Sequence, residues 1–185
     1  MNERREDMSE YGELLDESTV RFERVLPGPI ERVWEYIVES DKRRKWLCAG
    51  DIGAGAGAHV DMNFHNETLS TTDDIEVPEK YRKYAGEMSF TGAVTRWDPP
   101  HVVSHTWEFE DESSEVCYEL EEVGDKVRLV LTHRRLETGD KILSVSGGWH
   151  THLDILVDVL EGHEPGAFWK KQTALEAEYT ARLGL

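Results

Sequence analysis

The period of the hydrophobic positions changes twice near the start of the chain. Residues 18–26, STVRFERVL, alternate apolar and polar side chains, which predicts a β-strand with one buried face. Residues 27–40 then follow a helical period after Pro29, with one apolar face made of Ile30, Val33, Trp34 and Ile37. Residues 41–47, DKRRKWL, fit a second short helix. The pattern therefore predicts one strand followed by two short helices.

A period of two returns after a glycine-rich turn. Residues 58–64, AHVDMNF, predict a strand, and four more alternating segments follow between residues 87 and 136. Short turns such as Asp98-Pro99-Pro100 separate these segments, so we expect an antiparallel meander. Residues 65–85 have no clear period, and we expect a long loop with helical character around residues 78–84. Loops of this length commonly carry function.

The last part of the chain is helical. Residues 146–161 form one amphipathic segment, Pro165 and Gly166 interrupt it, and a second helical pattern runs from residue 167 to the end. Strands followed by helices predict an α+β fold, in which a curved antiparallel sheet grips a long C-terminal helix. We expect residues 18–185 to form one domain and residues 1–17, which are polar and acidic, to form a flexible tail.

Helical phase limits what the histidine-rich segment 147–162, GGWHTHLDILVDVLEG, can do. Successive residues of a helix turn by roughly 100°, so one apolar stripe contains Trp149, Leu153, Leu156 and Leu160. We expect this stripe to be buried and the opposite face, with Asp154 and Asp158, to be exposed. His150 points toward the exposed face, where a weak ion pair with Asp154 is expected. His150 and His152 face away from each other, which excludes a metal site made by both.

Net charge and cysteine usage narrow the classes of partner. The chain has 21 Lys and Arg against 38 Asp and Glu, a formal net charge of −17, which disfavours nucleic acid and membrane surfaces as partners. Residues 1–10 are charged throughout and contain no apolar signal-peptide core. Cys48 and Cys117 stand alone, as structural thiols in a reducing cytoplasm do. We therefore expect a cytoplasmic protein. As its oligomeric state we expect a monomer or a homodimer.

One glycine-rich stretch matches a cofactor motif only in its letters. Residues 53–58, GAGAGA, satisfy the relaxed dinucleotide pattern G-x-G-x-x-A. That motif needs a strand before it and a helix after it, whereas here a short helix precedes and a strand follows. The sequence also contains no G-x-S-x-G, H-E-x-x-H or P-loop motif. We therefore expect no cofactor, and no catalytic residue can be assigned.

Strand alternation carries two histidines toward the interior. His105 shares a strand face with Val103 and Trp107, and His133 shares one with Leu129 and Leu131. With His152 at the edge of the helical stripe, three imidazoles could approach one cavity and form a metal site. No close ligand spacing supports that site, so we expect each histidine to hydrogen-bond locally and no metal to bind.

Tryptophan content indicates an apolar pocket. The chain contains six tryptophans, of which Trp34, Trp46, Trp107 and Trp149 fall at inward positions. A cluster of this kind suits a cavity with few polar anchors. We expect a cavity between the sheet and the C-terminal helix, lined by Trp46, Met62, Phe90, His105, Trp107, Tyr118, Leu131, His133, Trp149, His152, Leu153 and Leu156.

The chain resembles the START-like (SRPBCC) superfamily over about residues 18–183. The resemblance is carried by VRFERVLPGPIERVWEYIVESDKRRKWL, FTGAVTRWDPPHVVSHTW, VRLVLTHRRL and GGWHTHLDILVDVLEG. Within the superfamily, these segments are most similar to the group named after the C-terminal domain of the heat-shock-protein ATPase activator. The resemblance implies a helix-grip fold with a hydrophobic cavity. Members bind lipids, polyketides or other apolar small molecules, and some are cyclases or hydroxylase domains.

Three functions are compatible with these features. The leading hypothesis is a protein that binds a small hydrophobic or aromatic molecule, with His105 or His133 orienting a polar group. The second is an enzyme of the cyclase or hydrolase type, in which an inward histidine acts as general base. The third is a protein-interaction module, such as a chaperone partner. An enclosed cavity favours the first two, and a filled core favours the third.

Overall fold

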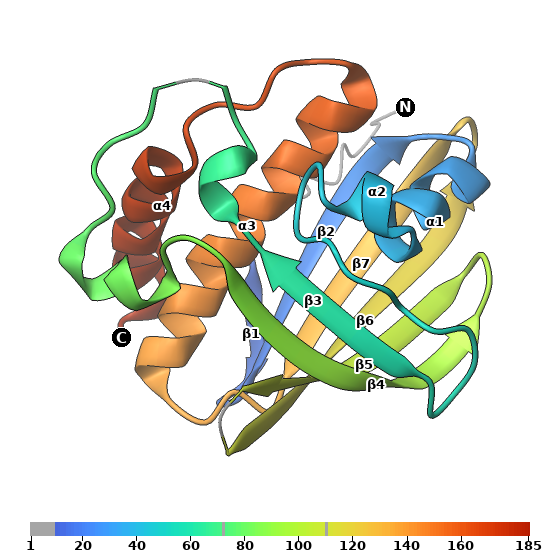
Figure 1. The fold of residues 1–185 in the computed structure, drawn as a ribbon, viewed down its shortest axis with the longest axis horizontal. Coiled ribbons are helices and arrows are strands. Elements are labelled where there is room, and N and C mark those ends of the chain that lie inside the picture. The colour runs from blue at the N-terminus through green and yellow to red at the C-terminus, as the bar shows by residue number, and fades with distance from the viewer. Residues whose placement is uncertain (1–9, 72, 110) are drawn as a thin grey trace, which may run out of the picture.

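A curved antiparallel sheet packed around a long helix forms the framework of the protein (Figure 1). The computed structural model describes residues 10–71, 73–109 and 111–185. Its strands, in chain order, are β1 (Glu13–Asp16), β2 (Thr19–Pro27), β3 (His59–Phe64), β4 (Met88–Asp98), β5 (Val102–Phe109), β6 (Glu112–Val123) and β7 (Lys126–Arg134). Across the sheet, neighbouring strands follow the order β1-β2-β7-β6-β5-β4-β3. The helices are α1 (Ile30–Val38), α2 (Ser40–Arg43), α3 (Gly139–Glu161) and α4 (Phe168–Leu183), with 3-10 turns η1 (Asn66–Thr68) and η2 (Glu79–Tyr84).

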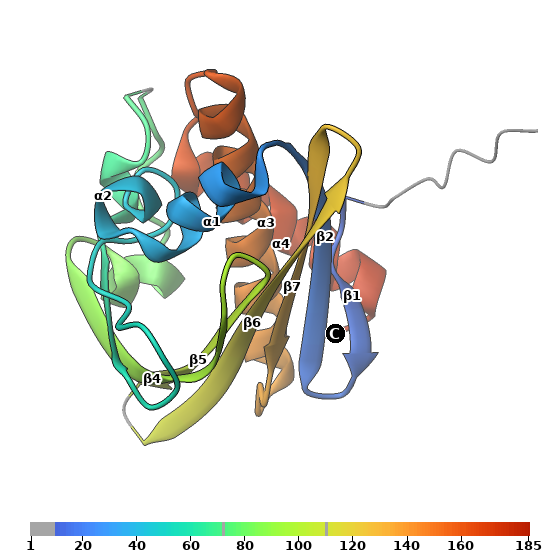
Figure 2. The same ribbon diagram turned by 90° about the vertical axis from the view of Figure 1, so that its right-hand side faces the viewer.

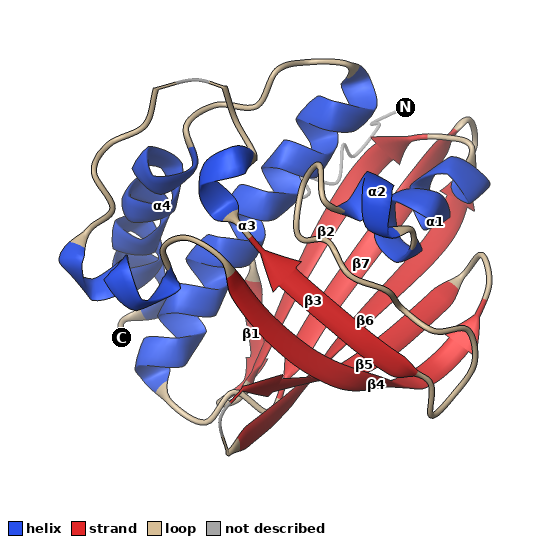
Figure 3. Ribbon diagram, in the orientation of Figure 1, coloured by secondary structure: helices blue, strands red, loops and turns tan. Residues whose placement is uncertain are grey.

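The observed arrangement is the α+β, helix-grip fold that the sequence predicts (Figure 3). Strands β4 to β7 form the expected meander, and β2 pairs with β7 through eight residue pairs from Val20↔His133 to Pro27↔Lys126. Figure 2 shows the sheet curving around α3, while α1 and α2 close one end. The predicted apolar face of α1, from Ile30 to Ile37, is buried. Within the described residues, no helix combines the length and the apolar character that crossing a membrane requires.

The sheet has an N-terminal edge strand that the sequence pattern does not predict. Residues 13–16, expected as part of a flexible tail, form β1 and pair with β2 through Leu14↔Val20. The hydroxyl of Tyr179 in α4 accepts a 2.7 Å hydrogen bond from the backbone N–H of Gly12. A four-residue strand is too short to show a period, and its pairing depends on backbone groups at the edge of β2. Residues 1–9 of the expected tail lie outside the described residues.

Helix α3 is longer than predicted, and both of its faces are covered. It begins at Gly139, where Thr138 caps it by accepting a 3.3 Å hydrogen bond from the backbone N–H of Lys141. Trp149, Leu153 and Leu156 are buried as predicted. The expected exposure of the opposite face is wrong, because α4 packs against it.

The residues expected on the exposed face of α3 show the effect of that packing. His150 is only 3% exposed, and its Nδ1 lies 3.0 Å from the hydroxyl of Tyr179. Asp154 is half-buried between Arg24 and Lys171, and Asp158 is also half-buried. Nε2 of His150 lies 3.6 Å from the carboxylate of Asp154, under α4. Burial lowers the pKa of His150 to about 4, so the ring is neutral near pH 7 and the expected ion pair on an exposed face does not form. A single helical period cannot reveal a second helix that covers the polar side.

Two adjacent glycines of α3, Gly147 and Gly148, have different surroundings. A Cβ atom on Gly147 would lie 3.2 Å from Nε2 of Gln172 and 3.5 Å from the backbone of Glu176. The same atom on Gly148 would meet only Oε1 of Gln172, at 3.8 Å, because this residue faces a cavity. Gly147 is therefore required for helix packing, and Gly148 leaves space in the interior.

The segment of residues 65–85 is the expected long loop with helical character, which η2 supplies. It is attached to α4 at several points. The carboxylate of Asp74 accepts hydrogen bonds from the backbone N–H groups of Trp169 at 2.6 Å and Lys170 at 2.9 Å. The hydroxyl of Ser70 donates to the carbonyl of Pro165 at 2.6 Å. The loop and α4 together form a wall over the open end of the sheet.

Candidate functional site

A cavity of about 680 Å³ lies between the inner face of the sheet, the first half of α3, the segment 65–85 and α4. Strands β3, β4 and β5 place three aromatic side chains on one side of it. The ring centroids of Phe64 and Phe90 lie 5.5 Å apart, and each lies less than 6 Å from that of Trp107, at 5.4 and 5.7 Å. Alternate residues of adjacent strands share a face, so this aromatic wall follows from the strand register.

Helices complete the aromatic lining from the other side. Trp149 of α3 meets Trp107 edge to face, with centroids 5.8 Å apart. Phe168 and Trp169 of α4 and Tyr81 of η2 also line the cavity. Such edge-to-face and stacked contacts stabilise aromatic groups by about 0.5–1.5 kcal/mol beyond the burial of area. An aromatic ligand in the cavity could make edge-to-face or stacked contacts with aromatic side chains on several sides.

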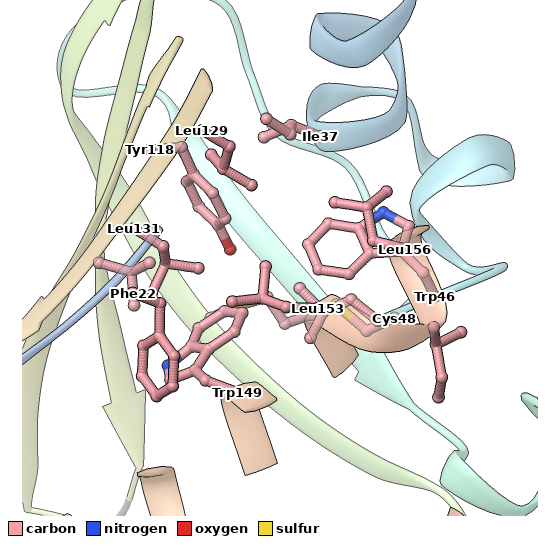
Figure 4. Packing of buried hydrophobic residues seen from close by; sticks show 14 of the residues in the cluster. Phe22, Ile37, Trp46, Cys48, Tyr118, Leu129, Leu131, Trp149, Leu153 and Leu156 are labelled. Carbon is pink, nitrogen blue, oxygen red and sulfur yellow. The ribbon is translucent and has the colours of Figure 1, made fainter. Parts of the chain in front are cut away.

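Five of the twelve residues expected in the pocket line this cavity: Phe90, Trp107, His133, Trp149 and His152. The other seven do not, since they are packed into the core: Trp46, Met62, His105, Tyr118, Leu131, Leu153 and Leu156. Figure 4 shows Tyr118, Leu131 and Leu153 close to Trp149 in this core. Their inward phase is correct, but the space between the sheet and the middle of α3 is filled. The cavity lies farther along, toward α4.

Sequence reasoning missed the wall made by α4 and η2. Tyr81, Phe168, Trp169 and Gln172 contribute to the lining, and none of them follows a strand or helix period that points to a cavity. The unusually long segment 65–85 is a signal that could have found Tyr81, because loops of that length often cover binding sites. Ser114 was missed for another reason. Ser114 lies near the start of β6, and a serine at such a position carries no pattern that separates it from an ordinary surface residue.

His133 belongs to a hydrogen-bonded row at the cavity. The indole N–H of Trp149 donates to Nδ1 of His133 at 2.9 Å, and Nε2 of His133 lies 2.8 Å from Oγ of Ser114. Burial lowers the pKa of His133 to about 3, with a smaller effect from His105, so the ring is neutral at physiological pH. An indole nitrogen can only donate. Nδ1 of His133 is therefore the acceptor, and Nε2 carries the proton that is donated to Ser114.

The other two inward histidines also form the expected local hydrogen bonds. Nδ1 of His105 donates to the carbonyl of Thr106 at 2.9 Å, and Nδ1 of His152 donates to the carbonyl of Trp46 at 2.8 Å. Burial lowers the pKa of each ring to about 4. Within the described residues, no group of three or more His, Cys, Asp and Glu side chains is placed to hold a metal ion.

Charged side chains surround the cavity in pairs. Lys80 forms an ion pair with Glu176, and Lys141 forms one with Glu112. Arg135, whose φ of 65° turns the chain from β7 toward α3, lies 3.9 Å from the carboxylate of Glu115. These pairs place opposite charges side by side at the rim, so the rim has little net preference for an anion or a cation.

Comparisons with known proteins agree with this geometry. Residues 27–161 match the model of a family described as Activator of Hsp90 ATPase homolog 1-like protein. The protein encoded by gene BPP1335 from Bordetella parapertussis is 38% identical, with a TM-score of 0.77 over 93% of this chain and 90% of that chain. None of the curated proteins matches this sequence.

Two more distant solved structures share the fold alone. CalU16 from Micromonospora echinospora is 18% identical, with a TM-score of 0.64 over 90% of this chain and 88% of that chain. DynU16, described as a protein in the dynemicin biosynthetic locus, is 16% identical, with a TM-score of 0.63 over 81% of this chain and 49% of that chain. The helix-grip framework is therefore retained while the sequence diverges widely.

Proposed function

The chain belongs to the family of Activator of Hsp90 ATPase homolog 1-like proteins, and from the geometry of its cavity we propose that it binds a small apolar or aromatic molecule. The observation that carries this proposal is a cavity of about 680 Å³ with aromatic side chains on opposite sides. Ligand sites typically occupy about 300–1,000 Å³ and combine apolar walls with a few polar groups. The cavity meets both conditions, with Ser114, His152 and Gln172 among its polar groups.

The state of the histidines favours binding over acid–base chemistry. A general base works best when its pKa lies near the operating pH. Burial holds the pKa of His133 at about 3 and that of His152 at about 4, so both are weak bases. Both ring nitrogens of His133 are also engaged, by Trp149 and Ser114. An open cavity, in turn, supports a ligand-binding role over a module that only contacts other proteins.

We also propose a cellular compartment and a class of partner for the protein. Cys48 and Cys117 are both free and buried, which supports a reducing compartment such as the cytoplasm. The formal net charge of −17 disfavours binding to nucleic acid or to anionic membranes. A small molecule is therefore the partner that we propose, with the protein as a monomer or homodimer.

Titration with the neutral fluorescent probe N-phenyl-1-naphthylamine tests the proposal. Gly148 faces the cavity, so Gly148→Phe should fill it, whereas Gly148→Ala should leave it open. We expect the wild type and Gly148→Ala to bind the probe with saturation, and Gly148→Phe to bind at least about tenfold more weakly because of steric exclusion. No saturable binding by the wild type, or equal binding by a folded Gly148→Phe, would refute the proposal. If the wild type binds the probe as expected, native mass spectrometry of freshly purified protein would identify any molecule that co-purifies.

A further inference from the structure

The row formed by Trp149, His133 and Ser114 leaves one proton available at the cavity. A serine hydroxyl has one proton to donate and lone pairs that accept. Ser114 accepts from Nε2 of His133 at 2.8 Å. Within the part of the chain that the structure describes, its own proton has one acceptor, the carbonyl of Trp107, at 3.4 Å. This distance is well beyond the 2.7–2.8 Å or so that is typical of hydroxyl hydrogen bonds, so a better acceptor in the cavity can take the proton.

We propose that Ser114 is the residue that selects the ligand, and that the ligand is an aromatic molecule carrying a carbonyl oxygen, which accepts the Ser114 proton. This inference rests on the proposed function and deepens it. Ser114 lines the cavity and is the direct cross-strand partner of Trp107. Side chains of such partners lie about 4.5–5.5 Å apart at Cβ. A ring in contact with Trp107 therefore brings its substituents to Ser114.

Trp149 determines the direction of the hydrogen bond between His133 and Ser114. Trp149 can only donate, so it holds Nδ1 of His133 as the acceptor. Burial keeps His133 neutral, so its single N–H must be on Nε2 and must point to Ser114. With one lone pair of Ser114 occupied, the hydroxyl presents a donor to the cavity. A donor selects an acceptor oxygen on the ligand and gives no advantage to a hydrocarbon.

The rim indicates that this oxygen is uncharged. Lys141 is paired with Glu112, and Arg135 lies beside Glu115, so the cations at this end of the cavity already face carboxylates. A ligand carboxylate would bring a third negative group to these pairs. A ketone or similar carbonyl accepts the Ser114 proton without that repulsion. Aryl ketones and quinones are therefore the class that this end of the cavity fits.

A pair of probes with the same shape tests the assignment. 2-Acetylnaphthalene and 2-isopropenylnaphthalene differ by a carbonyl oxygen in place of a methylene group. We expect the wild type to bind the ketone about three- to tenfold more tightly, which is the net effect of one hydrogen bond. Ser114→Ala should lose this preference by weakening ketone binding alone. Ser114→Thr keeps the hydroxyl and should keep the preference. Tryptophan fluorescence titration gives each dissociation constant.

The outcomes separate the two proposals. If the wild type binds both probes equally, or if Ser114→Ala retains the preference, the assignment of Ser114 is wrong and the cavity remains a binding site. If neither probe binds the wild type, the proposed function fails and the assignment fails with it. Ser114 is half-buried at the start of β6. Should Ser114→Ala unfold, Ser114→Cys repeats the test with a side chain of similar shape that donates only weakly.

Discussion

The rings of Tyr81 and Trp169 stack with centroids 5.5 Å apart and planes inclined by 27°, and through this contact the segment 65–85 meets α4. Both residues are buried and line the cavity. Within the described residues, neither the hydroxyl of Tyr81 nor Nε1 of Trp169 has a hydrogen-bond partner. Burying an unpartnered polar group costs about 1–3 kcal/mol. We therefore expect this wall to open more readily than the sheet and to be the route of ligand exchange.

Two substitutions at Tyr81 should have opposite effects on that wall. Tyr81→Phe keeps the stacked ring and removes the unpartnered hydroxyl, so it should raise the free energy of unfolding by up to about 1 kcal/mol. Tyr81→Ala removes the ring, so it should lower stability and speed dissociation of N-phenyl-1-naphthylamine. Denaturant melts and stopped-flow fluorescence measure the two quantities. If Tyr81→Ala left the dissociation rate unchanged, ligand exchange would not pass this wall.

The glycine pair of α3 offers a matched test of helix packing. Replacing an interior helical glycine by alanine typically stabilises a helix by about 0.5–1 kcal/mol. Gly148→Ala should show this gain, because its Cβ atom would meet only Oε1 of Gln172, at 3.8 Å. Gly147→Ala should show none of it, because its Cβ atom would lie 3.2 Å from Nε2 of the buried Gln172. Equal gains in urea melts would show that the two helices do not pack as described.

Acid should destabilise the protein through its buried histidines. Burial is the main cause that lowers the pKa of His133 to about 3 and of His105, His150 and His152 to about 4. The unfolded chain, with histidine pKa values near 6.5, binds these protons first as the pH falls. Between about pH 6.5 and pH 4, unfolding therefore takes up protons, and stability falls with decreasing pH by about 1.4 kcal/mol per unit for each such histidine.

The contribution of a single histidine can be measured by comparing how the free energy of unfolding changes with pH in the wild type and in a variant that lacks it. His152→Gln should reduce proton uptake on unfolding by about one near pH 5, because burial lowers the pKa of His152 to about 4 in the folded protein. Urea melts from pH 5 to pH 7 provide the slopes. Identical slopes for the wild type and His152→Gln would mean that His152 is protonated in the folded protein.

The carboxylate of Asp154 should matter more than a surface charge does. It lies 3.2 Å from Nη2 of the buried Arg24 and 2.5 Å from Nζ of Lys171. Asp154→Asn would leave the Arg24 guanidinium without its carboxylate, so it should cost about 1–3 kcal/mol. Asp158→Asn is the matched control one turn along α3, since no ion pair involves Asp158 within the described residues, and it should cost less than about 0.5 kcal/mol. Similar losses for both variants in thermal melts would argue against this partly buried cluster.

Periodic burial explains how much of the fold the sequence predicts. Strands β2, β3 and most of β7 alternate buried and exposed positions, and helix α1 buries one face, so their apolar positions repeat at the period of the element. Strand β1 has four residues and no period, and it exists because the edge of β2 offers free backbone groups. Residues 139–145, the first part of α3, have no single apolar face, because some of these side chains line the cavity and others contact the rest of the protein. Both β1 and the start of α3 depend on contacts with elements far away in the sequence, and a local pattern of apolar residues does not reveal such contacts.

The same distinction applies to the candidate site. Strand and helix phase places Phe90, Trp107, His133 and Trp149 on the inward side, and all four line the cavity. Phase cannot show whether the inward space is filled, which is why Leu153 and six other inward residues belong to the packed core instead. Side chains that reach the cavity from α4 and from the segment 65–85 do so because these segments fold back over the sheet.

The indole N–H resonances of the six tryptophans test the central claim most directly. Trp107, Trp149 and Trp169 line the cavity, whereas Trp34 of α1 and Trp97 of β4 contact each other, with centroids 5.3 Å apart. In ¹H–¹⁵N spectra recorded during titration with 2-acetylnaphthalene, we expect saturable shifts for the three cavity indoles and unchanged positions for Trp34 and Trp97. Unchanged cavity indoles, or shifts confined to Trp34 and Trp97, would contradict the claim that this cavity binds aromatic molecules.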